Sequence, residues 1–324
     1  MIVVTGGAGF IGSAAVWRLN GAGREDIVIV DELGSTDKWR NLVNLKYTEY
    51  LHKNVFLQMI GEDRVPFHVD AVIHMGACSS TTERDAEYLM ENNYRYSRML
   101  AEWAVRKKIR FIYASSAATY GDGSEGFSDS DVKSMTLRPI NMYGYSKQLF
   151  DLWVMRNDLA DRVTGIKFFN VFGPNEYHKG DMRSVIHKSL GQIRREGKVR
   201  LFKSYRPEYG DGEQQRDFIY VKDCVEVLWW FLNHDDATGI YNLGTGRART
   251  WNDLVRAVFA AMELTPDIEY IDMPESIRNQ YQYFTEARME KLRSRGCDWE
   301  FHSLEEAIDD YVGHYLKDGE DTLK

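Results

Sequence analysis

The pattern of apolar and polar positions predicts short buried strands that alternate with amphipathic helices. Continuous or nearly continuous apolar runs are expected to form strands, because each is short and is followed by residues at helical spacing. These runs cover residues 1–4, 27–30, 71–74, 111–114 and 165–169. Strands that alternate with helices are typical of a parallel, doubly wound sheet. We therefore expect an α/β fold.

The pattern changes after Pro174, where a glycine-bounded helix over residues 182–196 and irregular segments follow. A chain of 324 residues is longer than one hydrophobic core usually serves, so a second lobe is expected. We predict that residues 1–170 form the sheet domain, with later returns near 216–243. Residues 171–324 should form mainly the second lobe.

The composition narrows the classes of function. The net charge is −8, which argues against a general nucleic-acid or acidic-membrane surface. No apolar run reaches the ~18 residues of a membrane span, and we expect no signal segment, since the sequence opens with a predicted strand. Cys78, Cys224 and Cys297 are far apart and lack metal-ligand spacing. We expect a cytoplasmic protein with reduced thiols, no metal site and no nucleic-acid or membrane partner.

A glycine turn follows the first strand. Gly6, Gly9 and Gly12 are three residues apart, and a helical pattern begins at Ser13. This order of strand, turn and helix is typical of a dinucleotide site, because the free N–H groups and positive dipole end of the helix attract a pyrophosphate. Asp31 ends the second strand, 19 residues after Gly12, where an acid that binds the ribose is expected.

Two further strand ends carry small residues. Residues 75–80 follow the strand that ends at His74, and a small-residue turn there allows a cofactor to approach closely. We interpret His74 as a structural histidine. Gly244 and Gly246 follow a later strand, but Arg249 stands where a third glycine would be needed. A second dinucleotide site is therefore not expected.

Tyr143 and Lys147 are four residues apart at the start of a helix, so their side chains should share one face. A nearby ammonium favours the phenolate, and we expect Lys147 to lower the pKa of Tyr143. A tyrosine of this kind can take the proton of a carbinol while a hydride leaves. Ser115 and Ser116, at the end of the preceding strand, supply a hydroxyl to hold the substrate oxygen.

The glycine turn, Asp31, Ser116, Tyr143, Lys147 and the segment Asn170–Pro174 together resemble the extended short-chain dehydrogenase/reductase family. The resemblance implies a Rossmann doubly wound parallel sheet with a smaller C-terminal substrate-binding lobe for a sugar nucleotide. Dehydratases of this family usually carry an acidic pair after the serine. Residues 117–120 read Ala-Ala-Thr-Tyr here, which argues against dehydration.

Finer motifs are similar to the ADP-heptose 6-epimerases of that family. They include residues 76–83, 113–121, 173–180, 242–248 and 281–285. The resemblance implies inversion of C6″ of ADP-D-glycero-β-D-manno-heptose to the L-glycero form, a precursor of the lipopolysaccharide core. It also implies a transient ketone, tightly bound NADP and a homo-oligomer, with a pentamer typical of the nearest relatives.

The resemblance assigns roles residue by residue. Tyr143 and Lys179 are the two acid/bases, and Ser116 contacts the reacting oxygen. The cofactor residues are Gly6, Gly9, Phe10, Ile11, Gly12, Asp31, Glu32, Lys38, Lys53, Met75, Gly76, Ala77, Cys78, Ser79, Asn92, Lys147, Val171 and Lys179. The substrate residues are Ser116, Asn170, Asp181, His187, Phe202, Lys203, Ser204, Arg216 and Tyr281. The chain departs from the family pattern at Asp181, at Met75 and in an insertion at 203–215.

Two acid/bases suit an inversion, because the ketone must turn over and its oxygen then occupies two different places. Two alternatives stay open from the sequence. One is another nucleotide-sugar epimerase or a dehydratase of the same family. The other is a catalytically silent, NADP-binding regulatory protein, against which the intact Ser116, Tyr143 and Lys147 argue.

Overall fold

The computed structural model of the chain describes residues 1–278 and 281–324. Within these residues, parallel strands form a seven-stranded sheet in the order β10-β6-β5-β4-β1-β2-β3. The strands of this sheet are β1 Ile2–Thr5, β2 Ile27–Asp31, β3 Glu49–His52, β4 Ala71–His74, β5 Arg110–Ser116, β6 Val163–Phe168 and β10 Gly239–Leu243. The predicted α/β fold with a doubly wound parallel sheet is confirmed.

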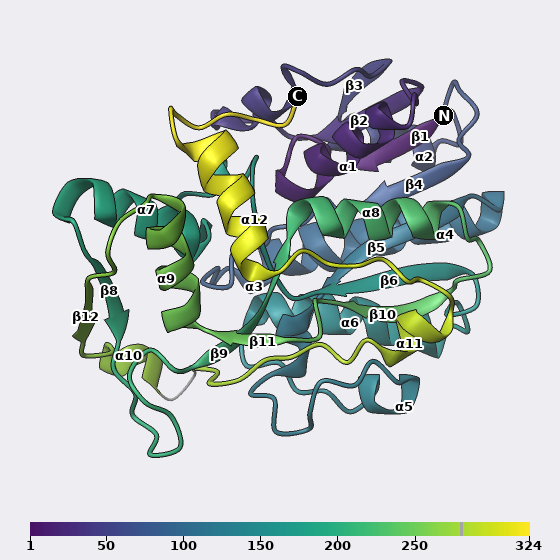
Figure 1. Cartoon of the computed structure of the whole chain (residues 1–324). Coiled ribbons are helices and arrows are strands. Elements are labelled where there is room, and N and C mark those ends of the chain that lie inside the picture. The colour runs from purple at the N-terminus through teal and green to yellow at the C-terminus, as the bar shows by residue number, and fades with distance from the viewer. Residues whose placement is uncertain (279–280) are drawn as a thin grey trace.

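Helices connect these strands and cover both faces of the sheet (Figure 1). They are α1 Phe10–Gly21, α2 Lys53–Gly61, α3 Ala86–Leu89, α4 Tyr96–Lys107, α5 Asp131–Ser134, α6 Met142–Arg156 and α8 Val221–Leu232. Shorter turns are η1 Asp37–Leu42, the π-helical η2 Met90–Arg95 and η3 Ala117–Tyr120. Elements α3, η2 and α4 follow one another without a gap, so residues 86–107 form one continuous run that contains a π turn.

Alternate strand residues divide between two hydrophobic clusters, one on each face of the sheet. Val3 and Val28 pack with Phe56 of α2, while Ile2 and Ile29 pack on the opposite face with helices α1 and α8. Successive strand side chains point to opposite faces, so apolar residues at every position bury both. This explains why the strands read as continuous apolar runs rather than as alternating patterns.

Most of the remaining elements gather beside the sheet, on the left in Figure 1, whereas α11 Glu290–Ser294 lies on the right, beside β10. The other helices and turns are η4 Tyr177–Met182, α7 Val185–Glu196, α9 Trp251–Ala261, α10 Glu275–Arg278, α12 Leu304–Asp310 and the π-helical η5 Tyr311–Leu316. Strands β7 Asn170–Phe172, β9 Gln215–Tyr220 and β11 Ala248–Thr250 form one small sheet, and β8 Val199–Phe202 pairs with β12 Ile268–Ile271. No clear sequence pattern marked strands β3, β7, β8, β11 and β12.

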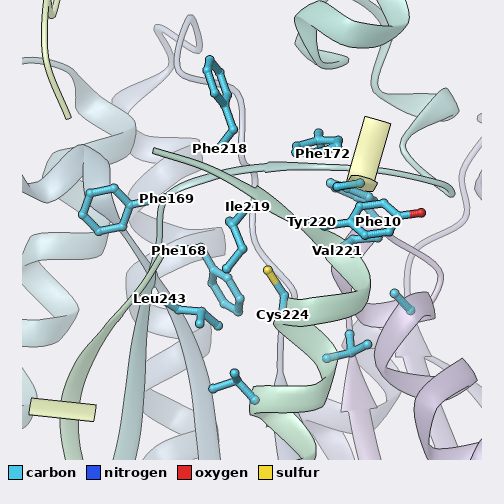
Figure 2. Packing of buried hydrophobic residues seen from close by; sticks show 14 of the residues in the cluster. Phe10, Phe168, Phe169, Phe172, Phe218, Ile219, Tyr220, Val221, Cys224 and Leu243 are labelled. Carbon is cyan, nitrogen blue, oxygen red and sulfur yellow. The ribbon is translucent and has the colours of Figure 1, made fainter. Parts of the chain in front are cut away.

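Aromatic and aliphatic residues join the small sheet to the large one. Phe168, Ile219 and Leu243 belong to one buried cluster and point into the same space in Figure 2. Strand β7 follows β6 almost directly in the chain. This packing therefore fixes the positions of the strand ends at which the active-site cavity opens. No helix among the residues described is long and apolar enough to span a bilayer.

Candidate active site

A cavity of about 650 Å³ lies at the carboxyl ends of β1, β2, β4, β5 and β6. In open α/β sheets this edge is where ligands bind. Many of the residues singled out from the sequence line it. They are Gly6, Gly9, Phe10, Ile11, Gly12, Asp31, Lys38, Met75, Gly76, Ala77, Ser79, Ser116, Tyr143, Lys147, Asn170, Val171, Lys179, Arg216 and Tyr281.

The glycine turn is built so tightly that side chains do not fit. A Cβ at Gly12 would lie 2.0 Å from the Gly6 carbonyl oxygen. Gly6 has φ +65, and a Cβ there would lie 2.6 Å from the Cα of Gly76. Helix α1 begins at Phe10 with no side-chain cap, so the N–H groups of its first turn face the cavity without a side-chain acceptor. These features fit the pyrophosphate of a dinucleotide.

The two acids at the carboxyl end of β2 each pair with a lysine. The carboxylate of Asp31 accepts from the Ala8 N–H at 2.9 Å and pairs with Lys38 at 2.7 Å. Glu32 pairs with Lys53 at 2.6 Å, and this bond lowers the pKa of the Glu32 carboxyl. The end of β2 therefore carries balanced charge rather than a bare carboxylate.

His74 links the ends of β1 and β4 to helix α4. Ser97 Oγ lies 2.5 Å from the Asn93 carbonyl and must donate to it, so it accepts from His74 Nε2 at 2.8 Å. His74 Nδ1 is then the acceptor for the Thr5 hydroxyl at 2.5 Å. Burial lowers the pKa of His74 to about 3, so the ring is neutral. This agrees with a structural role for His74.

Helix α6 places Tyr143 at the same wall of the cavity as Ser116, the last residue of β5. Asn141 caps the helix by accepting from the Gly144 N–H at 2.8 Å. A Cβ at Gly144 would lie 2.6 Å from the Ala118 carbonyl oxygen, so only glycine lets this helix end approach η3 closely. Burial raises the pKa of Tyr143, and a hydrogen bond with Ser116 opposes that rise.

The predicted effect of Lys147 on Tyr143 is wrong. Lys147 Nζ donates to the Ala114 carbonyl at 2.7 Å, and burial lowers its own pKa to about 8. The pKa of Tyr143 is raised, because the loss of water around the phenol outweighs the hydrogen bond with Ser116. Tyr143 therefore keeps its proton at neutral pH when no cofactor or substrate is bound.

Lys179 faces the cavity from the 3-10 turn η4. Its ammonium lies 5.2 Å from the centre of the Phe10 ring, a cation–π distance. Burial lowers the pKa of Lys179, while Glu176 opposes this effect. A lysine with a lowered pKa can exchange a proton near neutral pH.

Asn175 and Glu176 fix the start of η4. Asn175 is fully buried and bonds to Ser13 Oγ at 2.9 Å and to the Leu323 N–H at 3.0 Å. Its φ of +76 suits asparagine. Glu176 accepts from the Tyr311 hydroxyl at 2.9 Å and from the Ser184 N–H at 2.6 Å. The turn that carries Lys179 is thus tied to α1 and to the C-terminal segment.

Arg216 provides a buried cation at the other end of the cavity. Its guanidinium lies 5.3 Å from the Tyr281 ring and 5.8 Å from the Trp251 ring, and it donates to two backbone carbonyls. Burial lowers the pKa of Arg216, and among the residues described no carboxylate contributes to that pKa. A cation held without an acid partner suits an anionic ligand such as a diphosphate.

The other predicted site residues lie outside the cavity lining. His187 bonds to Glu320 at 2.8 Å, and Lys203 pairs with Asp272 at 3.2 Å. Asp181 is exposed. The others are Glu32, Lys53, Cys78, Asn92, Phe202 and Ser204. Lys53 donates to Asn92 at 3.0 Å, so these two approach each other at the rim of the dinucleotide region.

Several lining residues were not singled out from the sequence as site residues. They include Thr81, Ala114, Ile140, Asn141, Phe169, His178, Met182, Trp251, Gln282 and Thr285. Buried Asn93 was also missed; it holds Cys78 through both backbone groups and donates to Ser146 of α6 at 3.0 Å. The sequence feature that could have pointed to Asn93 is the adjacent pair Asn92-Asn93. The structure places this pair in a π turn, which is frequent at functional sites. Within the described ranges, no three acidic, His or Cys side chains are grouped to hold a metal.

Comparisons with known proteins agree with this geometry. Residues 2–244 match the model of the NAD dependent epimerase/dehydratase family. The chain is 62% identical over 316 residues to the ADP-L-glycero-D-manno-heptose-6-epimerase of Nitratidesulfovibrio vulgaris strain DP4, covering 98% of each chain. The enzyme of the same name from Fusobacterium nucleatum subsp. nucleatum is 47% identical, again over 98% of each chain.

A solved structure gives the same result in three dimensions. The crystal structure of Helicobacter pylori ADP-L-glycero-D-manno-heptose-6-epimerase superposes with a TM-score of 0.81. Sequence identity to that chain is 28%, and the match covers 97% of the present chain and 95% of the other. The similarity therefore includes both the large sheet and the smaller lobe.

Proposed function

The chain belongs to the NAD dependent epimerase/dehydratase family, and from this premise we propose its reaction in full. It inverts C6″ of ADP-D-glycero-β-D-manno-heptose to give ADP-L-glycero-β-D-manno-heptose, a heptose precursor of the lipopolysaccharide core. The reaction proceeds through transient oxidation to a ketone by a tightly bound nicotinamide cofactor. The epimerase names of relatives over nearly the full length support this function.

One observation carries the proposal. Tyr143, Ser116 and Lys179 line the same cavity as the glycine turn and Arg216. An acid/base pair, a dinucleotide cradle and a buried cation are the parts that an internal oxidation of a sugar nucleotide requires. A binding protein without chemistry would not need two proton-exchanging groups beside the cradle.

The residues of the chain divide the work as follows. The bound nicotinamide supplies reversible acceptance of a hydride from C6″. Tyr143 Oη exchanges the proton of the sugar hydroxyl in one orientation, and Ser116 Oγ donates to the reacting oxygen. Lys147 contributes positive charge behind Tyr143. Arg216, between Tyr281 and Trp251, holds the diphosphate.

Lys179 serves the second orientation of the ketone. A proton-exchanging group must lie within hydrogen-bond reach of its oxygen, and one group cannot reach two separate positions. Tyr143 comes from α6 and Lys179 from η4, so they approach the cavity from different elements. This arrangement supports one acid/base for each epimer.

NADP is the proposed cofactor. A lone carboxylate at Asp31 would repel a 2′-phosphate and favour NAD. Here Lys38 pairs with Asp31 and Lys53 pairs with Glu32. A 2′-phosphate bound at this place could take over from the two carboxylates as the partner of both lysines. The balanced charge of these four groups supports NADP over NAD.

We also propose the domain organisation and the assembly. Residues 1–170, with returns near 216–243, bind the cofactor, and residues 171–324 bind mainly the substrate. The protein is a cytoplasmic homo-oligomer, with a pentamer as the expected form; its three cysteines are free thiols, as in a reducing compartment. Light scattering that gives the mass of one chain, 37.6 kDa, would contradict the oligomer.

The decisive experiment is turnover of ADP-D-glycero-D-manno-heptose by purified protein with no cofactor added. NMR of the product should show the L-glycero epimer, because the oxidant is already bound and is regenerated in each cycle. A keto-deoxy product would identify a dehydratase instead. Protein that carries cofactor but turns over no nucleotide sugar would support a silent regulatory role.

A further inference from the structure

A buried ion pair lies beneath the active-site wall. Helix α6 carries Tyr143, Lys147 and Asp151 at intervals of four residues, which places them along one face. Asp151 pairs with Lys167 of β6 at 2.6 Å, and both side chains are completely buried. Neither side chain lines the cavity. Their burial therefore calls for a role other than contact with a ligand, because buried charges are costly.

The pair is connected to Ser116 from both sides. Asp151 accepts from the Ser115 hydroxyl at 2.7 Å. Lys167 donates to Thr119 Oγ1 at 2.8 Å, and that hydroxyl donates to the Ser116 carbonyl at 2.8 Å. The backbone on both sides of Ser116 is thus tied to one rigid charge pair.

The pair also acts on Lys147. Lys147 donates to the carbonyl of Ala114, the residue before Ser115. Burial pulls its pKa down, and the negative charge of Asp151, one turn further along α6, opposes that effect most strongly. The other titratable or charged groups around the two residues are Tyr143, Cys78, His74, Tyr113 and Lys167.

We propose that the Asp151–Lys167 pair is the positioning element of this active site: it holds Ser116 in register with Tyr143 and keeps Lys147 charged. Both are positioning residues, because they act through Ser115, Thr119 and Lys147. This inference rests on the proposed epimerase function. It explains why a charged pair, rather than apolar side chains, occupies the space under α6.

The test compares three variants of the holoenzyme. Asp151→Asn removes the charge in a nearly isosteric side chain. Asp151→Asn with Lys167→Met removes both charges, so that no buried charge is left unpaired if the single variant fails to fold. Thr164→Val is the matched control, because Thr164 is also a buried β6 residue whose hydroxyl donates to a carbonyl, that of Ala237, away from the pair.

Both pair variants should lower kcat roughly 10- to 100-fold at unchanged KM, because a misplaced catalytic group reduces rate rather than binding. Thr164→Val should keep the wild-type kcat. In Asp151→Asn the alkaline limb of the kcat profile should move to lower pH. The titration of Lys147, followed by NMR of ¹⁵N-lysine-labelled protein with Lys147→Met for assignment, should move the same way.

Folded pair variants with wild-type kcat, and a Lys147 titration that does not move in Asp151→Asn, would overturn the proposal. Losses of equal size in Thr164→Val would also overturn it, because they would show a general packing effect. If wild-type protein forms no epimer, the proposed function fails. The NMR titration of Lys147 would still decide the inference in that case.

Discussion

The ammonium of Lys179 lies 5.2 Å from the centre of the ring of Phe10, the first residue of the helix that follows the glycine turn. The two residues are far apart in sequence, and the structure brings them to one cavity. The proposed second acid/base is therefore next to the dinucleotide cradle. Predictions about the cofactor and about the chemistry can be tested on the same few residues.

The identity of the bound cofactor tests the charge balance at the end of β2. Mass spectrometry of the ligand released from purified wild-type protein should give NADP. Lys53→Ala should raise the share of NAD, because Glu32 then loses its cation and repels a 2′-phosphate. Lys46→Ala is the control, since Lys46 forms an exposed pair with Glu25 on the surface. Recovery of NAD alone from wild type would reverse the assignment.

Gly12→Ala tests the cradle. The added Cβ would lie 2.0 Å from the Gly6 carbonyl oxygen, so the turn must open and bound cofactor should be lost. Gly21→Ala in the same helix meets nothing within 4 Å and should keep full cofactor content. It should also gain about 0.5–1 kcal/mol of stability. Cofactor absorbance per chain and thermal unfolding measure both effects; equal cofactor content in the two variants would count against the cradle.

The pH dependence tests Lys147. Its pKa is lowered to about 8, so the charged form is lost as pH rises through that value. We expect kcat of the holoenzyme to fall above about pH 8. Lys147→Arg, whose guanidinium keeps its charge, should be slower but should lack this fall. An alkaline limb that stays in place in Lys147→Arg would assign it to another group.

Asn175→Gly tests how the Lys179 turn is held. Glycine accepts the φ of +76 but cannot bond to Ser13 or to the Leu323 N–H. We expect kcat, measured per bound cofactor, to fall roughly 10-fold as Lys179 loses its fixed position. Asp158→Gly is the control, because Asp158 also has positive φ but is exposed and follows the end of α6 opposite to Tyr143. Equal rates for the two variants would show that Asn175 does not position Lys179.

The sequence allowed much of this site to be predicted where the signal was local. The spacing of Gly6, Gly9 and Gly12, and that of Tyr143 and Lys147, depends only on turn and helix geometry. The direction of the Tyr143 pKa could not be predicted, because it depends on how much water the fold excludes.

Residues that act through long-range contacts could not be predicted from the sequence either. Asn175 bonds to residues 162 positions before it and 148 positions after it. Trp251 enters the cavity from a segment whose sequence has no functional pattern. Lys53 and His187 were singled out by resemblance, yet their side chains pair with Glu32 and Glu320 outside the lining.

The central claim is that Tyr143 and Lys179 each serve one orientation of the ketone. Tyr143→Phe and Lys179→Met should both lose most epimerisation while cofactor stays bound, by the ~10²–10⁴-fold that a general acid/base contributes. A simpler aldehyde substrate can be reduced and oxidised without turning over. With that substrate, one variant should keep much of the wild-type rate and the other should not.

The most direct measurement is therefore the rate of epimerisation by Lys179→Met at saturating ADP-D-glycero-D-manno-heptose. The account predicts a loss of at least ~10²-fold in kcat with the cofactor still bound. A rate near that of wild type would contradict it and leave Tyr143 acting alone. A raised KM with unchanged kcat would equally contradict it, because Lys179 would then only bind the substrate.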